Sequence, residues 1–152
     1  MKTIEISRAV VAGRALVAAA RRADTNKNGL TTAEIHQASA DGVITRRETG
    51  ALLREHLNHR ISVNNDPEIP ASEKDRARAF MDVDEVKFAM SMAVEQLKKI
   101  DEYKGTKRPA RPANEPDGFV TEAEVKNYGP SRGDFQKEAG RLVDFMLGNS
   151  AP

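Results

Sequence analysis

The sequence contains no cysteine and no tryptophan, and only two tyrosines and five phenylalanines. The absence of cysteine excludes disulfides, thiolate zinc sites and cysteine nucleophiles, and fits a reducing compartment. The scarcity of aromatic residues favours helices over an all-β sandwich. Lys and Arg number 24 against 23 Asp and Glu, so no general charge attracts the chain to nucleic acid or an anionic membrane. These absences indicate a helical globular protein.

No apolar run is long enough to span a bilayer. The N-terminal segment superficially resembles a signal peptide, but Glu5, Arg8 and Arg14 interrupt its apolar runs. Its apolar residues instead follow helical spacing, which predicts a mature helix with one buried face. The expected location is therefore the cytoplasm.

Amphipathic patterns predict further helices at about 46–61, 85–103 and 132–147. Gly148 is well placed to end the last of them in a left-handed conformation. The stretch 104–116 carries three prolines and four basic residues, and is predicted to be an extended loop.

The polar segment 62–71 contains two prolines and is predicted to be a connection between lobes. The sequence therefore predicts a first lobe at 1–61 and a second lobe at 72–152.

A short pattern occurs four times, in GLTTAEI, GVITRRET, FMDVDEV and GFVTEAEV. Each copy has an apolar residue, then Thr or Asp, and a glutamate three residues after that Thr or Asp. This is the pattern of a capping box, so each copy is predicted to be a short extended piece that enters a helix. The apolar residues are Leu30, Ile44, Met81 and Val120; the caps are Thr31, Thr45, Asp82 and Thr121; the glutamates are Glu34, Glu48, Glu85 and Glu124.

The residues before the first copy, DTNKNG at 24–29, resemble the calcium-binding loop of the EF-hand family. In that family, side-chain oxygens at loop positions one, three and five bind Ca²⁺, a glycine at position six makes a sharp turn, and a glutamate at position twelve chelates the ion. The resemblance implies an all-α fold of EF-hand-like helix-loop-helix units, with very short antiparallel β pairings between loops. It also implies Ca²⁺ as the cofactor.

The first loop, from Asp24 to Glu34, is implied to be the best calcium site. Asp24 and Glu34 would supply carboxylates, Asn26 and Asn28 amide oxygens, and the backbone near Leu30 a carbonyl. The loop is one residue shorter than in the family, so Glu34 arrives one position early. Asn in place of Asp also lowers the negative charge, and we expect weak affinity.

The second and fourth loops, counted back twelve positions from Glu48 and Glu124, match the family less well. Each keeps only part of the oxygen set that Ca²⁺ requires. The candidate ligands are Ser39, Asp41 and Glu48 in the second loop, and Glu115, Asp117 and Glu124 in the fourth.

The first position of the fourth loop falls on Ala113, which has no side-chain oxygen. This position therefore lacks a ligand unless the loop bulges to bring in Asn114. The third loop begins at Lys74 and has Arg76 and Arg78 where oxygen ligands belong. We expect the third loop to bind no cation and to keep only the scaffold.

The apolar residues of two such loops normally pair with each other in a tiny antiparallel sheet. The order along the chain predicts that Leu30 pairs with Ile44, and Met81 with Val120. The alternative is that Ile44 pairs with Met81, which would leave Leu30 to pair with Val120.

His56 and His59 lie three residues apart on a predicted helix, but no third ligand accompanies them, so we interpret them as ordinary helix residues rather than a metal site. No nucleophile with a base, phosphate loop or paired acids indicates catalysis, and we expect no enzyme.

The sequence thus predicts a calcium-binding or calcium-responsive EF-hand-like interaction protein, with a protein or peptide partner and neither nucleic acid nor membrane. The alternative is a metal-independent structural or adaptor module. A weaker hypothesis is an anionic partner for Lys104, Lys107, Arg108 and Arg111.

Overall fold

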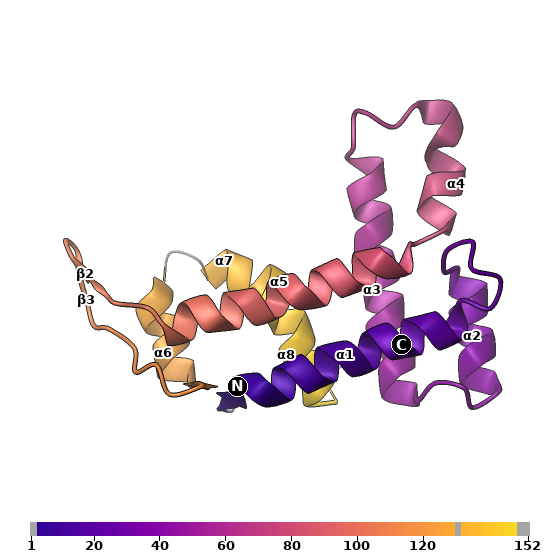
Figure 1. The fold of residues 1–152 in the computed structure, drawn as a ribbon. Helices are drawn as coiled ribbons and strands as arrows, with labels where there is room; N and C mark the ends of the chain where they lie inside the picture. The colour runs from indigo at the N-terminus through magenta and orange to yellow at the C-terminus, as the bar shows by residue number, and fades with distance from the viewer. Residues whose placement is uncertain (1–2, 130–131, 149–152) are drawn as a thin grey trace. The chain divides into compact units, whose positions relative to one another are not determined.

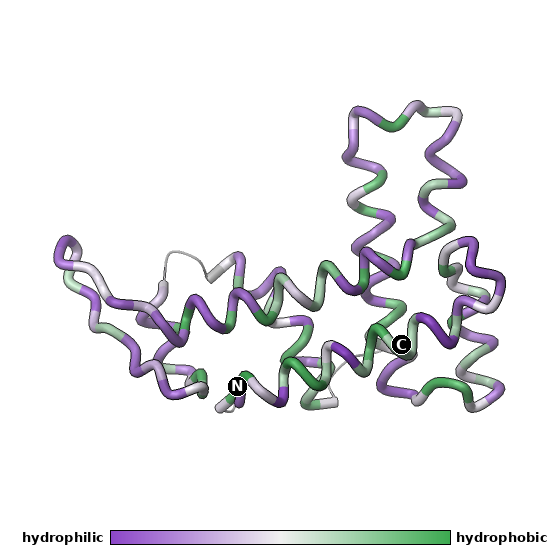
Figure 2. Tube along the Cα trace, in the orientation of Figure 1, coloured by the Kyte–Doolittle hydropathy of each residue, from purple (hydrophilic) through white to green (hydrophobic). Residues whose placement is uncertain are grey.

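The computed structural model describes residues 3–129 and 132–148. The protein is mostly helical, with two antiparallel sheets of two strands each (Figure 1). Hydrophobic and hydrophilic residues alternate along the long helices α1 (Ile6–Ala23) and α5 (Val83–Asp101), as expected of helices with one buried face (Figure 2). In the described part of the chain, no helix has both the length and the hydropathy needed to cross a membrane.

The chain divides into two compact units. Among the described residues, one contains 15–88 and Gly148, and the other contains 3–14, 89–129 and 132–147; we call them the 15–88 unit and the 89–147 unit. The division falls within α1 and α5. The predicted connection at 62–71 therefore lies inside the 15–88 unit, and residues 149–152 of the predicted second lobe lie outside the described residues.

In the 15–88 unit, the helices after Thr31 and Thr45 start where the capping pattern predicted. Thr31 and Thr45 each accept a hydrogen bond from the amide of the glutamate three residues later, and that glutamate bonds back to the cap amide. These two capping boxes are confirmed. After the end of α1, the elements are α2 (Thr32–Ala40), α3 (Arg46–Asn64), the 3₁₀ turn η1 (Ala71–Glu73), α4 (Lys74–Ala79) and the start of α5.

Leu30 and Met81 connect the first and third loops of this unit by an antiparallel bridge. The Leu30 amide donates to the Met81 carbonyl at 2.7 Å, and the Met81 amide donates to the Leu30 carbonyl at 2.9 Å. Both side chains are fully buried. The predicted pairing of Leu30 with Ile44 is wrong: the Ile44 amide donates to the carbonyl of Ala38, at the end of the short helix α2.

The 89–147 unit contains the second bridge, between β1 (Ile4–Glu5) and β4 (Phe119–Val120). Val120 lies opposite Ile4, so the predicted pairing of Val120 with Met81, and the alternative with Leu30, are both wrong. The N-terminal strand takes the place of a second loop. This prediction failed because the residues before α1 carried no loop motif that would mark them as a partner.

The remaining elements of the 89–147 unit follow α5. The basic stretch predicted to be extended forms a β-hairpin, and Thr121 begins a helix with a confirmed capping box. The predicted last helix contains a π-helical segment and is followed by Gly148, which has the expected positive φ of 74°. The elements are β2 (Thr106–Lys107), β3 (Ala110–Arg111), β4, α6 (Glu122–Tyr128), α7 (Arg132–Asp134), η3 (Phe135–Ala139) and α8 (Gly140–Met146).

The capping box predicted for the third copy of the pattern, at the start of α5, is wrong. The Asp82 side chain accepts from the amide of Asp84 at 3.0 Å, and the Glu85 amide donates to the backbone carbonyl of Asp82. The Glu85 carboxylate is left free to bind elsewhere.

Candidate metal centre

Asp101 is the last residue of α5, and its side chain is buried with a fractional exposure of 6%. Its Oδ2 accepts a hydrogen bond from the backbone amide of Gly118 at 3.1 Å. Its Oδ1 is buried as well and has no hydrogen-bond partner within the described residues. A buried carboxylate oxygen without a donor is costly, because it loses hydration without compensation. A cation at this oxygen would remove the cost.

Two further carboxylates converge on Asp101. Oxygens of Asp101, Asp117 and Glu124 lie within 4.8 Å of one another, and we call these residues the carboxylate cluster. Asp117 is exposed, and its Oδ1 accepts from the amide of Phe119 at 3.0 Å. Carboxylates this close repel one another, so the arrangement favours a bound cation. Within 3–129 and 132–148, no other group of three acidic or histidine side chains is close enough to share an ion.

Glu124 has structural contacts in addition to its place in the cluster. Its Oε1 accepts from the amide of Thr121 at 3.0 Å and completes the capping box of α6. Its Oε2 accepts from the amide of Glu115 at 3.2 Å. Binding an ion through both oxygens would require Glu124 to weaken these hydrogen bonds. Glu124 therefore connects cation binding to the start of α6 and to the backbone at Glu115.

Hydrogen bonds of Asn114 join the chain near the end of α5, next to Asp101, to the segment that carries the rest of the cluster. Its buried side-chain amide donates to the carbonyls of Ile100 at 2.7 Å and Glu124 at 3.0 Å, and its oxygen accepts from Asn127 at 2.9 Å. Its backbone amide donates to the carbonyl of Tyr103 at 2.8 Å. The chain thus leaves the loop after Asp101 and returns beside it at Asn114. Residues 102–113 are an excursion within the loop.

This excursion explains where the sequence prediction for the fourth loop failed. Counting back from Glu124 with a fixed loop length placed Ala113 at the first position, whereas Asp101 occupies that place beside the cluster. Asp117 and Glu124 do belong to the cluster, but Glu115 contributes its backbone amide and is not among the clustered carboxylates. Asp101 was missed, although an acidic residue at the end of a predicted helix, just before a proline-rich stretch, was a usable signal.

The first loop also contains carboxylate oxygens without partners. Asp24 is buried, and its Oδ1 has no hydrogen-bond partner in the described chain. Glu34 uses Oε1 in its capping box, while its Oε2 is buried and without a partner. The Asn26 side chain accepts from the amide of Asn28 at 3.0 Å, and the carbonyl of Leu30 already accepts from Met81. Two carboxylates at the two ends of this loop thus remain available.

The candidate ligands of the second loop are engaged by protein groups. Asp41 Oδ1 accepts from the side-chain amide of Gln37 at 2.9 Å. Glu48 completes the capping box with Thr45 and lies 3.5 Å from the guanidinium of Arg22. For Ser39, the third candidate, the backbone carbonyl accepts from the amide of Gly42 at 3.2 Å, and the side-chain prediction is not tested. The structure does not bring these residues into a cluster.

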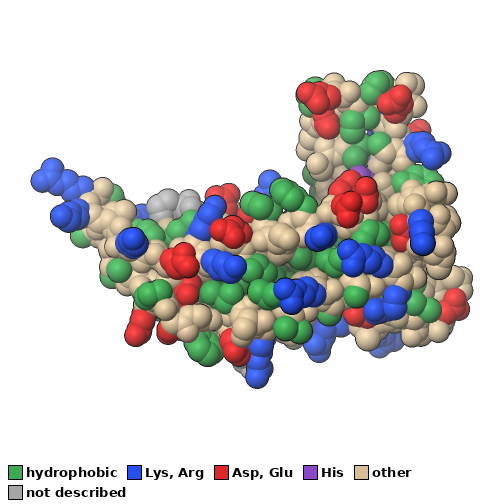
Figure 3. Space-filling model, in the orientation of Figure 1, with side chains coloured by type: hydrophobic (Ala, Val, Ile, Leu, Met, Phe, Trp, Pro, Cys, Tyr) green, Lys and Arg blue, Asp and Glu red, His purple; other side chains and the backbone are tan. Residues whose placement is uncertain are grey.

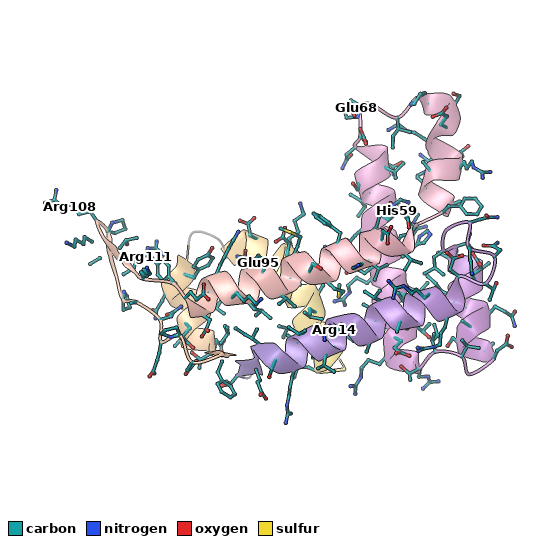
Figure 4. The ribbon with its side chains drawn as sticks, in the orientation of Figure 1. Arg14, His59, Glu68, Glu95, Arg108 and Arg111 are labelled. Carbon is teal, nitrogen blue, oxygen red and sulfur yellow. The ribbon has the colours of Figure 1, made fainter. Side chains whose placement is uncertain are left out.

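In the third loop, cationic side chains occupy the region where metal ligands would be expected. The ammonium of Lys74 donates to the carbonyls of Val63, Asn64 and Asp66, at 2.9 to 3.0 Å, and so caps the end of α3. The His59 ring lies between two acceptors: its Nδ1 is 2.5 Å from Glu85 Oε2, and its Nε2 is 2.6 Å from the carbonyl of Ala77. Figure 4 shows His59 where α3 passes the start of α5.

Two acceptors facing both nitrogens favour the doubly protonated His59 ring. The hydrogen bond that the His59 ring donates to the Glu85 carboxylate raises the pKa of His59, against a smaller opposing effect of burial. Burial instead lowers the pKa of His56, whose Nε2 faces the carbonyl of Ala79 at 3.1 Å. The two histidines therefore bind different protein acceptors, as expected of helix residues that do not share a metal.

No protein-family model, curated protein or solved structure matches this chain.

Proposed function

We propose that the protein is a calcium-binding interaction protein without catalytic activity, and that its principal ion site is the carboxylate cluster. The observation that carries the proposal is the Asp101 carboxylate: its buried Oδ1 has no donor within the described residues, and one of its oxygens lies within 4.8 Å of oxygens of Asp117 and Glu124. The EF-hand resemblance of the repeated loops supports the same function.

Ca²⁺ fits the cluster better than other common ions. The donors are hard carboxylate oxygens, and neither cysteine nor histidine belongs to the cluster, which disfavours zinc and copper. Three carboxylates offer up to six oxygens, within the coordination number of Ca²⁺, whereas Mg²⁺ requires strict octahedral geometry and keeps several waters. When bound, Ca²⁺ would neutralise the cluster. Asp101 would hold it from the end of α5, and Glu124 from the start of α6.

The first loop is a second candidate site. It has two negative charges at most, from Asp24 and Glu34, and its asparagines add only neutral amide oxygens. Affinity in such loops rises with the number of charged ligands, so we expect this site to be the weaker one, in the range of about 10⁻⁴ to 10⁻³ M.

Calorimetric titration of chelator-treated protein with Ca²⁺ tests the proposal. Asp101→Asn removes the charge at the buried oxygen and should abolish the tighter heat signal. Glu102→Gln is the matched control, because Glu102 is the adjacent, exposed carboxylate. The control should titrate as the wild type does. Equal loss of heat in both variants would contradict the assignment of the site.

Terbium luminescence separates the two candidate sites. The only tyrosines of the sequence, Tyr103 and Tyr128, lie in the 89–147 unit, where their rings contact each other edge to face at 5.3 Å between centroids. Terbium that replaces calcium in the carboxylate cluster should therefore be excited through tyrosine. Asp101→Asn should remove this emission, whereas Asp24→Asn should leave it.

A metal-independent adaptor is the second candidate function. The observation in its favour is that the third loop is complete without metal, because His59 and Lys74 supply the positive charge. A wild-type protein with neither calcium heat nor tyrosine-excited terbium emission at millimolar ion would favour the adaptor.

A further inference from the structure

The excursion inside the fourth loop is a basic hairpin. Its four cations, Lys104, Lys107, Arg108 and Arg111, fall within eight residues, and no acidic residue occurs between Glu102 and Glu115. None of the four side chains has a hydrogen-bond or ion-pair partner in the described part of the chain. Figure 3 shows blue Lys and Arg atoms at the end of the hairpin, and Figure 4 places Arg108 at its tip and Arg111 nearer its base. We call residues 104–111 the basic hairpin.

The basic hairpin is an ordered element rather than a loose linker. Strands β2 and β3 pair in antiparallel register, with Lys107 opposite Ala110, and the Thr106 hydroxyl donates to the carbonyl of Pro109 at 2.5 Å. Gly105 has a φ of 76°, and a Cβ there would collide with the carbonyl oxygen of Arg111. Glycine is therefore required for the close approach of the two strands. An ordered hairpin presents its cations at lower entropic cost than a flexible chain.

The hairpin and the carboxylate cluster share one loop, so their charges are coupled. The cluster carries three negative charges at the base of the hairpin, where it would repel an anion that approaches the four cations. Binding of one Ca²⁺ would reduce the formal charge of the cluster from minus three to minus one. The electrostatic potential around the hairpin then becomes more positive, and anionic partners are favoured.

The surroundings of the cations indicate what kind of anion they suit. The stretch between Tyr103 and Asn114 contains no aromatic residue to stack on the bases of a single strand, and no large apolar residue to insert into a lipid surface. Each strand of the two-stranded sheet has an outer edge without a neighbouring strand in the described structure. Such an edge can accept an extended peptide through backbone hydrogen bonds.

We propose that the basic hairpin is the docking site for an acidic peptide segment of a protein partner, and that Ca²⁺ at the carboxylate cluster strengthens the docking. The coupling rests on the proposed function, whereas the hairpin and its charge do not. Because coupling between two binding sites is reciprocal, the acidic peptide must raise the calcium affinity by the same factor. We expect this factor to be at least about five.

Fluorescence anisotropy with a labelled peptide of alternating Glu and Thr tests this proposal, in calcium and in chelator. The wild type should bind the peptide, more tightly in calcium, and less tightly as salt rises. Lys107→Gln/Arg108→Gln should lose most of the binding while keeping the calcium heat. Lys98→Gln/Lys99→Gln, two exposed lysines at the end of α5, is the matched control and should bind as the wild type.

Four outcomes would overturn parts of this assignment. Unchanged peptide affinity in Lys107→Gln/Arg108→Gln would remove the hairpin as the docking site. Binding to phosphatidylserine vesicles or to duplex DNA, without binding to the peptide, would replace the peptide by another class of partner. Calcium heat with a calcium-independent peptide affinity would overturn the coupling alone. Absence of calcium heat in the wild type would overturn the proposed function together with the coupling.

Discussion

Glu85 and Glu124 occupy the same place in the third and fourth loops, four residues after a buried bridging residue, but they contact different groups. Glu85 pairs with the His59 ring and takes no part in a capping box. Glu124 caps α6 and lies beside Asp101 and Asp117. In the third loop a protein cation neutralises the glutamate. In the fourth loop the glutamate contacts backbone amides and other carboxylates, and no cationic side chain pairs with it within the described residues.

This difference shows that the repeated pattern specifies the scaffold of each loop. The pattern does not specify which positive charge, if any, neutralises the terminal glutamate. Both loops keep the extended residue that joins a bridge, Met81 in one and Val120 in the other. What differs is the side chain that a neighbouring helix brings to the terminal glutamate: His59 from α3, or Asp101 from the end of α5. The comparison can be tested first by substitutions in the scaffold of the loops and then by substitutions of their charged side chains.

Met81→Ala should have the largest effect on stability, because it removes a buried side chain from the scaffold of the third loop. Met81 is 1% exposed, and truncation of a buried Met to Ala costs about 2–5 kcal/mol. The free energy of unfolding from urea titration measures the loss. The loss should be the same in calcium and in chelator, because we expect the third loop to hold no ion; a loss present only in chelator would contradict this.

Asn114→Ala should destabilise the fourth loop by about 1–3 kcal/mol, since it leaves buried carbonyls without donors. The third loop has no equivalent, because no excursion interrupts it. The variant should also weaken calcium binding, as Asn114 brings the chain back beside Asp101. Urea titration and calorimetry measure the two effects. Asn127→Ala, which removes only the contact with the oxygen of Asn114, should have a smaller effect on both.

Glu124→Gln and Glu85→Gln are the direct comparison of the two glutamates. Calcium at ten times its dissociation constant should stabilise the wild type by about 1.4 kcal/mol, because the ion binds only the native state. Glu124→Gln should lose this stabilisation, and Glu85→Gln should keep it. The melting temperature with and without calcium provides the measurement. Loss of the calcium effect in both variants would mean that the third loop also holds an ion.

The pH dependence of stability should reveal the histidine of the third loop. The pKa of His59 is raised by Glu85 above its unfolded value of 6.5, so its contribution is complete below pH 6.5 and is lost as pH rises through the folded pKa. The pKa of His56 is lowered by burial, so His56 opposes folding only as pH falls below 6.5. Stability above pH 6.5 should therefore decline in the wild type.

Urea midpoints measured at a series of pH values above 6.5 check this. Glu85→Gln should remove most of the decline, because the neutral amide no longer favours the charged ring. His36→Gln, at an exposed histidine of α2, is the control and should keep the decline. A decline that persists unchanged in Glu85→Gln would assign it to another group.

The sequence by itself determined the starts of three helices and the buried residues in front of them. Thr31, Thr45 and Thr121 form capping boxes as predicted, because the cap and its glutamate are three residues apart and their contact depends only on the local backbone. The burial of Leu30, Ile44, Met81 and Val120 was predictable for the same reason: each is an apolar residue at a fixed place in a local pattern.

Tertiary structure alone decided which segments pair and which side chain meets each glutamate. Val120 pairs with Ile4 rather than with another loop, and Asp101 joins Glu124 across a hairpin that no fixed loop length anticipates. Glu85 pairs with His59, which folding brings beside it, and does not form the expected capping box. These contacts join residues far apart in the chain, and their choice depends on how the helices pack. A local pattern specifies that a residue needs a partner, whereas packing selects the partner.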